Sequence, residues 1–210
     1  MQQKLGTILF LLIFAIAGLT QTVIQVSAGD GELKTIVEAA ADGDIIELID
    51  GGGLYTTSGS DKIAVKAGVT IRAAEGLADK PIIRNTNAGA SSARLFEVQA
   101  GGSLILIGLD LDGRLEDGGI AHAKNAIRNE NVAQADSIHT PHIKIYDCVF
   151  HDVKEVFIKG HAYTSLDSLI VDNCLFVNAG REAILTRESE AEGSTDVTFI
   201  GVENSTFSNI

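Results

Sequence analysis

The sequence predicts an all-β fold in which short parallel strands wind into a solenoid. Two observations lead to this prediction: a short pattern recurs along the chain, and each copy ends in the same kind of corner residue. The pattern reads YDCVFHD at Tyr146–Asp152, DNCLFVN at Asp172–Asn178 and ENSTFSN at Glu203–Asn209, with a weaker copy, IGLDLDG, at Ile107–Gly113. A period of roughly 20–50 residues is typical of solenoids, propellers and arrays. The steps are irregular, which indicates loops of variable length around a constant core element.

Each copy has an apolar residue at its centre and a corner residue two positions later. The central residues are Leu111, Phe150, Phe176 and Phe207. The corner residues are Gly113, Asp152, Asn178 and Asn209. Gly, Asn and Asp are the residues that most readily adopt a positive φ angle. We therefore expect a short strand with alternate side chains inward, followed by a one-residue corner in the left-handed conformation.

Other alternating segments flank the copies and complete each turn of the coil. They are His142–Ile145, Ser168–Val171 and Val197–Val202 before the copies, and Val156–Lys159 and Ala183–Thr186 after them. Three short strands per turn describe a coil in which each strand pairs with its counterpart in the next turn, about 4.8 Å away. A β-sandwich with coincidental asparagines is the alternative, but sandwiches rarely repeat a corner residue in register.

A short amphipathic helix is expected near the start of the coil, over Glu32–Ala41. Its apolar residues follow the spacing i, i+3, i+4 and i+7, at Leu33, Ile36, Val37 and Ala40. Asp30 is a suitable N-cap, and Gly43 a suitable stop. Such a helix would cover the open end of the core, where unpaired strand edges would otherwise attract another chain.

Residues 1–20 are predicted to be a secretory signal peptide, which leaves 21–210 as one β-helix domain. Lys4 supplies the positive start, and Ile8–Ile16 is an apolar run too short for a spanning helix, which needs about 20 residues. An uncleaved membrane anchor is the alternative. Export would place the protein in the periplasm, at the cell surface or in the medium, with no membrane attachment after cleavage.

The net charge limits the possible binding partners, and the positions of the cysteines predict whether they form a disulfide. The formal net charge of −12 over 210 residues argues against binding to nucleic acid, which requires a basic surface. Cys148 and Cys174, the two cysteines, occupy the same position in adjacent copies of the pattern. Side chains in register on parallel strands run side by side, which is poor geometry for a disulfide. We expect a ladder of free, inward thiols.

A family resemblance rests on two stretches, GDIIELIDGGGLY at Gly43–Tyr55 and KIAVKAGVTIRAAEGLADKPII at Lys62–Ile83. They resemble the first turns of right-handed parallel β-helix proteins of the pectate-lyase-like superfamily, and look closest to the chondroitinase B and alginate lyase family of polysaccharide lyases. The corners at Asp152, Asn178 and Asn209 are similar to the asparagine ladder of pectate lyases.

The resemblance implies β-elimination on a polysaccharide that contains uronic acids. In the family, a bound calcium neutralises the uronate, a lysine removes the C5 proton and an arginine assists the leaving oxygen. No stretch of this sequence matches the motifs that carry that lysine and arginine. Because the last pattern stops at its corner with no capping element, we expect the chain to be the N-terminal part of a longer protein, truncated at its C-terminus. A non-catalytic carbohydrate-binding or cell-surface β-helix is the alternative function.

The candidate calcium site follows from the alternation of inward and outward residues. If Ile145 and its counterparts point inward, then Tyr146, Asp172 and Glu203 point outward, one above another. Carboxylates roughly 5 Å apart repel one another unless a cation lies between them, and oxygen ligands suit calcium. We therefore hypothesise that Asp172 and Glu203 form half of a calcium site beside a Tyr146 that stacks on sugar. A solvated face of an acidic protein is the alternative.

The candidate catalytic residues are Lys159 and Arg187, which end the third strand in successive turns. They could form a basic patch for a uronate, and exposed charges at strand ends are the alternative. His151 and His161 flank the same strand. A histidine base is chemically suitable near neutral pH, but no partner is fixed by spacing, and both are interpreted as surface histidines.

Overall fold

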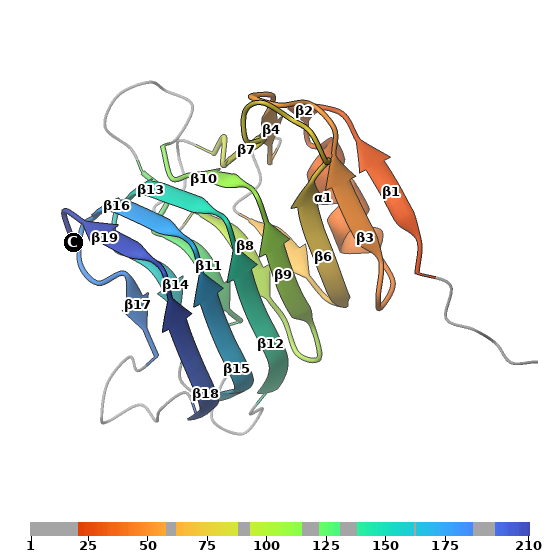
Figure 1. The fold of residues 1–210 in the computed structure, drawn as a ribbon. Helices are drawn as coiled ribbons and strands as arrows, with labels where there is room; N and C mark the ends of the chain where they lie inside the picture. The colour runs from red at the N-terminus through yellow and green to blue at the C-terminus, as the bar shows by residue number, and fades with distance from the viewer. Residues whose placement is uncertain are drawn as a thin grey trace, which may run out of the picture.

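Three parallel sheets make up the molecule in the computed structural model (Figure 1). The residues that the structure describes are 21–57, 62–87, 93–114, 122–130, 138–161, 163–186 and 196–210. All pairings between the named strands are parallel, and each strand pairs with strands from neighbouring turns of the chain. This confirms the predicted parallel β-helix. Residues 1–20, the predicted signal peptide, lie outside the described residues, and no described helix is long and apolar enough to cross a membrane.

The first sheet has seven strands, which lie side by side so that the sheet extends along the whole stack in Figure 1. They are β1 (Val23–Val26), β3 (Ile45–Leu48), β6 (Gly68–Ala73), β9 (Ser103–Ile107), β12 (Ile138–Tyr146), β15 (Thr164–Asp172) and β18 (Asp196–Glu203). Alternation along each strand separates its two faces. In β15, Leu169 and Val171 are buried in the core while Asp172 lies on the opposite face.

The second sheet also has seven strands, and the third has five. The second contains β2 (Gly29–Asp30), β4 (Leu54–Thr56), β7 (Ile82–Arg84), β10 (Asp110–Asp112), β13 (Val149–Val153), β16 (Leu175–Ala179) and β19 (Thr206–Ser208). The third contains β5 (Ile63–Val65), β8 (Arg94–Val98), β11 (Asn125–Asn129), β14 (Val156–Lys159) and β17 (Ile184–Leu185).

The central residues of the repeated pattern form a column through the core, as the sequence predicts. Leu111, Phe150, Phe176 and Phe207 are paired in register across β10, β13, β16 and β19. The rings of Phe150 and Phe176 stack with their centroids 4.8 Å apart, and those of Phe176 and Phe207 with theirs 4.9 Å apart. Phe157 of the third sheet meets Phe150 edge-on at 5.9 Å. Aromatic contacts thus join successive coils and two sheets.

The capping helix is present as α1 (Glu32–Ala39), at the end of the stack that holds the first strands (Figure 1). Leu33 and Val37 are buried against the core, as expected from their spacing. The predicted N-cap is wrong: the helix begins after Gly31, whose φ is 75°, and no side chain caps it. Asp30 instead accepts a hydrogen bond from the Thr56 hydroxyl. Glycine suits the residue before this helix because most other residues disfavour the left-handed conformation.

Three of the four predicted corners are left-handed: Asp152, Asn178 and Asn209 have φ angles of 58°, 61° and 54°. Their side chains form a ladder, in which Asn178 Nδ2 donates to Asp152 Oδ1 at 2.9 Å and Asn209 Nδ2 to Asn178 Oδ1 at 3.0 Å. Gly113 is not left-handed, so that part of the prediction is wrong. Glycine is needed there for space, because an added Cβ would lie 2.2 Å from the carbonyl oxygen of Asp152.

A second column of left-handed corners, between the first and second sheets, was not predicted. Gly108, Asp147, Asn173 and Asn204 have φ angles of 72°, 53°, 52° and 48°. Asn173 Nδ2 donates to Asp147 Oδ1, and Asn204 Nδ2 to Asp172 Oδ1 at 2.9 Å. The corners of the coil therefore combine the backbone preference of Asn and Asp with hydrogen bonds that join successive turns.

The thiol ladder is confirmed, since Cys148 and Cys174 are both free and buried. Each thiol donates to a carbonyl at its own corner, Cys148 to Tyr146 and Cys174 to Asp172, at 3.2 Å in both cases. Burial raises the pKa of Cys148 to about 12. Both cysteines thus act as small apolar core residues.

Candidate functional site

The most elaborate polar cluster among the described residues lies on the outer face of the second sheet. Arg84, Asp112 and His151 share one register row across β7, β10 and β13. Their neighbours Leu111 and Phe150 point into the core, so alternation turns these three side chains outward. Consecutive coils therefore place a guanidinium, a carboxylate and an imidazole side by side.

Asp112 is the centre of this cluster and is fully buried. Arg84 donates to Asp112 Oδ2 through Nε at 2.9 Å and through Nη2 at 2.5 Å. Arg114 adds bonds from Nη2 to Oδ2 at 2.7 Å, and from Nε and its backbone N–H to Oδ1 at 2.9 Å. Burial by itself raises the pKa of Asp112, but the hydrogen bonds from Arg114 and Arg84 outweigh it and hold the pKa at about 2.

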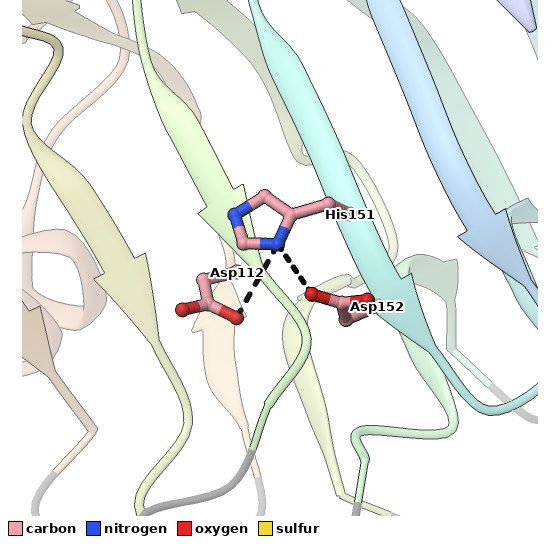
Figure 2. Close-up of side chains that lie close together, drawn as sticks. All are labelled: Asp112, His151 and Asp152. Atoms are coloured by element: carbon pink, nitrogen blue, oxygen red, sulfur yellow. Dashed lines mark hydrogen bonds and ion pairs between the residues drawn. The ribbon is translucent and has the colours of Figure 1, made fainter. Parts of the chain in front are cut away.

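His151 lies between two further carboxylates. Its Nε2 is 2.9 Å from Asp110 Oδ1, and its Nδ1 is 2.8 Å from Asp152 Oδ2. Figure 2 shows Nδ1 directed between Asp152 and Asp112, the latter 3.7 Å away. The hydrogen bond to Asp110, assisted by the other carboxylates, raises the pKa of His151 to about 9 although burial opposes it. The imidazole is therefore charged at neutral pH.

Asp112, His151 and Asp152 each offer one atom that could ligate a metal ion. Among the residues that the structure describes, they are the one group of three or more His, Cys, Asp or Glu residues whose ligand atoms all lie within 4.8 Å of one another. The hydrogen bonds and protonation of these side chains, however, do not suit a metal ion. Both oxygens of Asp112 already accept bonds from arginine, and His151 would have to lose its proton to ligate. Three aspartates balance two arginines and an imidazolium, so we interpret the cluster as an ionic brace between coils.

The row predicted for calcium is formed as expected. Tyr146, Asp172 and Glu203 are partners in register across β12, β15 and β18. Asp172 Oδ1 accepts the bond from Asn204, and Glu203 is exposed. The register brings the two carboxylates onto neighbouring strands, and whether they bind calcium stays a prediction.

The structure does not bring the two catalytic candidates into one described site. Lys159 ends β14, beside Arg128 in register, and is buried with 5% of its surface exposed. Arg187 lies outside the described residues. The same row continues to Glu97 of β8, a buried carboxylate that pairs with Lys62 and with Arg94 at 2.8 Å. Lys159 thus belongs to a buried row of charged residues, and the alternative of an exposed strand-end charge is wrong for it.

Sequence reasoning missed most of the brace. His151 is ion-paired and largely covered, and His161 is buried, so the interpretation of both as surface histidines is wrong. Asp110 and Asp112 stand in the weak copy IGLDLDG, and alternation alone places them on the outer face. Arg84 could not be identified from the sequence, because no sequence pattern indicates which residue of an earlier coil lies beside Asp112.

The stacked strands, aromatic column and asparagine ladder define a parallel β-helix, in the right-handed form that the sequence resemblance implies. Among solved structures the chain is similar to the PL6 family alginate lyase AlyGC, with a TM-score of 0.72 and 22% identity over 91% of this chain and 25% of that one. A point variant of that enzyme gives a TM-score of 0.71, with the same identity and coverage. The chain thus spans about a quarter of the length of AlyGC. No family model matches the sequence, and no curated protein matches it.

Proposed function

We propose that this β-helix belongs to a secreted protein that cleaves a polysaccharide containing uronic acids by β-elimination. The observation that carries the proposal is the structural similarity to an alginate lyase over 91% of the chain, at a TM-score of 0.72. The apolar run at Ile8–Ile16 supports export, because its length suits a signal peptide better than a spanning helix.

The chemistry of this reaction needs a cation near the uronate and a base near its C5 proton. A carbon acid beside a carboxylate is hard to deprotonate, and neutralising that carboxylate makes the proton more acidic. Asp172 and Glu203 are the residues we propose for holding calcium, with Tyr146 beside them to contact the sugar ring. Lys159 and Arg187 are the basic residues suggested by the sequence, but Lys159 is buried in the third sheet whereas Asp172 and Glu203 belong to the first, so Lys159 does not share their site.

The reaction is tested on the purified protein with alginate, pectate and dermatan sulfate as substrates. Elimination leaves an unsaturated sugar, so we expect ultraviolet absorbance to rise together with new reducing ends. New reducing ends without that absorbance would indicate a hydrolase and overturn the proposal. Binding of the polymers with no product of either kind would favour the alternative, a non-catalytic carbohydrate-binding β-helix, which the acidic charge of −12 and the unmatched catalytic motifs favour.

Calcium is tested separately, through the melting temperature. We expect added calcium to raise the melting temperature of the natural chain, because an ion that binds only the folded state stabilises it. The double substitution Asp172→Asn and Glu203→Gln should abolish the increase, while the amide oxygen introduced at position 172 can still accept the bond from Asn204. Asp167→Asn is the matched control, since Asp167 lies on the same strand and is exposed. An unchanged melting temperature in the natural chain would refute the calcium site.

A further inference from the structure

A surface cavity of about 330 Å³ lies at the corner between the first and second sheets. Its lining residues are Lys80, Asp147, Cys148, Val149, Asn173, Cys174, Leu175, Asn204 and Thr206. This volume is at the lower end of the range for small-molecule pockets, about 300–1,000 Å³. The cavity follows the second column of left-handed corners, so neighbouring coils each contribute side chains to its wall.

Lys80 is the cation of this cavity. It lies just before β7, and its Nζ donates at 2.5 Å to the carbonyl oxygen of Asp147, which lies two coils further along the chain. Gly108 occupies the intervening corner without a side chain. An ammonium group has three donors, and among the described residues no carboxylate lies within ion-pair distance of Lys80. Asp147, the other charged residue of the wall, directs its carboxylate to Asn173 instead.

The remaining wall combines polar amides with an apolar surface. Asn173 and Asn204 are exposed, and the side-chain amide of each donates one bond between coils. Each amide has a second N–H, which takes no part in these bonds. Leu175 is 38% exposed and lies beside Val149 in register, and the two buried cysteines line the same cavity. Apolar side chains flanked by amides and one cation suit a sugar ring, whose C–H face is apolar and whose edge is polar.

From these contacts we infer that the corner cavity binds one sugar residue of a uronic acid chain, with Lys80 on the carboxylate and Leu175 under the ring. The inference rests on the proposed function for its ligand class, because a neutral sugar would leave the ammonium of Lys80 without an anionic partner. It adds a binding position that lies next to the proposed calcium residues, since Asn204 of its wall donates to Asp172 Oδ1, and that does not include Lys159.

Binding of a short saturated oligouronate, too short to be cleaved, tests this inference by calorimetry. Because Lys80→Gln removes a charge-assisted contact, it should weaken binding about tenfold or more. Lys80→Arg keeps the charge and should retain binding. Lys154→Gln is the matched control, because Lys154 is exposed and lies outside the cavity. A neutral oligosaccharide of the same length should bind the natural chain weakly.

The outcomes separate this inference from the proposed function. Equal binding by the Lys80→Gln and Lys154→Gln variants, or equal affinity for neutral and acidic oligosaccharides, would overturn the cavity assignment, even where the polymer assays give unsaturated products. Conversely, Lys80-dependent binding of the oligouronate with no unsaturated product would support the cavity and contradict the lyase. Oligouronate binding that is absent from the natural chain would overturn the cavity assignment as well.

Discussion

Phe176 and Phe207 occupy the same place in successive coils, yet their surroundings differ. Phe176 is fully buried, with an aromatic ring stacked on each of its faces, whereas Phe207 is 42% exposed and, among the described residues, stacks on Phe176 alone. The first sheet repeats the contrast, because Val171 is fully buried and its partner in register, Val202, is 42% exposed. Burial in this fold is therefore decided by the coils on either side, and not by residue type or by alternation alone.

The largest effect is expected from truncating the two rings. Phe176→Ala should lower the free energy of unfolding by about 4 kcal/mol, because it removes a fully buried aromatic side chain and leaves a cavity. Phe207→Ala should cost about 1–2 kcal/mol, because part of the ring is already in water. Denaturant unfolding measures both changes. Equal losses would show that the two positions are energetically equivalent, against the contrast in their burial.

The ionic brace extends the comparison to the outer face of the second sheet. His151 lies between Asp110 and Asp152, while the same row holds Val177 and Ser208 in the next two coils. Within this row the brace is therefore confined to the coils that carry Arg84, Asp112 and His151. The pKa of His151 is raised from 6.5 to about 9, so its stabilisation is complete below about pH 6.5 and is lost as the pH rises through about 9.

We expect the natural chain to lose on the order of 3 kcal/mol of stability between these two pH values, from the size of the pKa shift. His151→Gln should remove most of this pH dependence, which unfolding curves at a series of pH values measure. Lys154→Gln serves as a control for a general change in surface charge. A pH dependence that survives in the His151→Gln variant would place its origin elsewhere.

The smallest effect is expected in the asparagine ladder. Asn178 bonds to the coils on both sides, whereas Asn209 bonds to one. Asn178→Ala should therefore cost about 1–2 kcal/mol, from two lost hydrogen bonds and a left-handed backbone that alanine disfavours. Asn209→Ala should cost about half as much, as measured by thermal unfolding. A larger loss of stability at Asn209 would contradict the view that the number of neighbouring coils decides how much each corner stabilises the fold.

Much of the fold could be predicted because the coil converts sequence position into spatial position. Phe150 and Phe176 stack because each occupies the same place in its pattern, and the corners at Asp152 and Asn178 follow from the residues that tolerate a positive φ. Gly113 was misread because glycine meets two different needs, a left-handed backbone and close approach, and the sequence does not distinguish them.

The candidate sites were less predictable, since they depend on side chains from several coils. The Tyr146, Asp172 and Glu203 row was found by alternation along strands of one repeated type. The brace at Asp112 was not, because Arg84 comes from an earlier coil that lacks the pattern. The Lys80 cavity likewise requires the turn before β7 to reach Asp147, across sequence of no recognisable repeat.

The amino-acid sequence by itself determined the coil, its aromatic column, its thiol ladder and the column of corners at Asp152, Asn178 and Asn209, because these depend on alternation and on local backbone preferences. The tertiary structure decided which outward groups meet: Arg84 with Asp112, His151 with Asp110, and Lys80 with Asp147. The physical reason is that loops of unequal length set the register between coils, and that register becomes fixed only when neighbouring strands form their backbone hydrogen bonds.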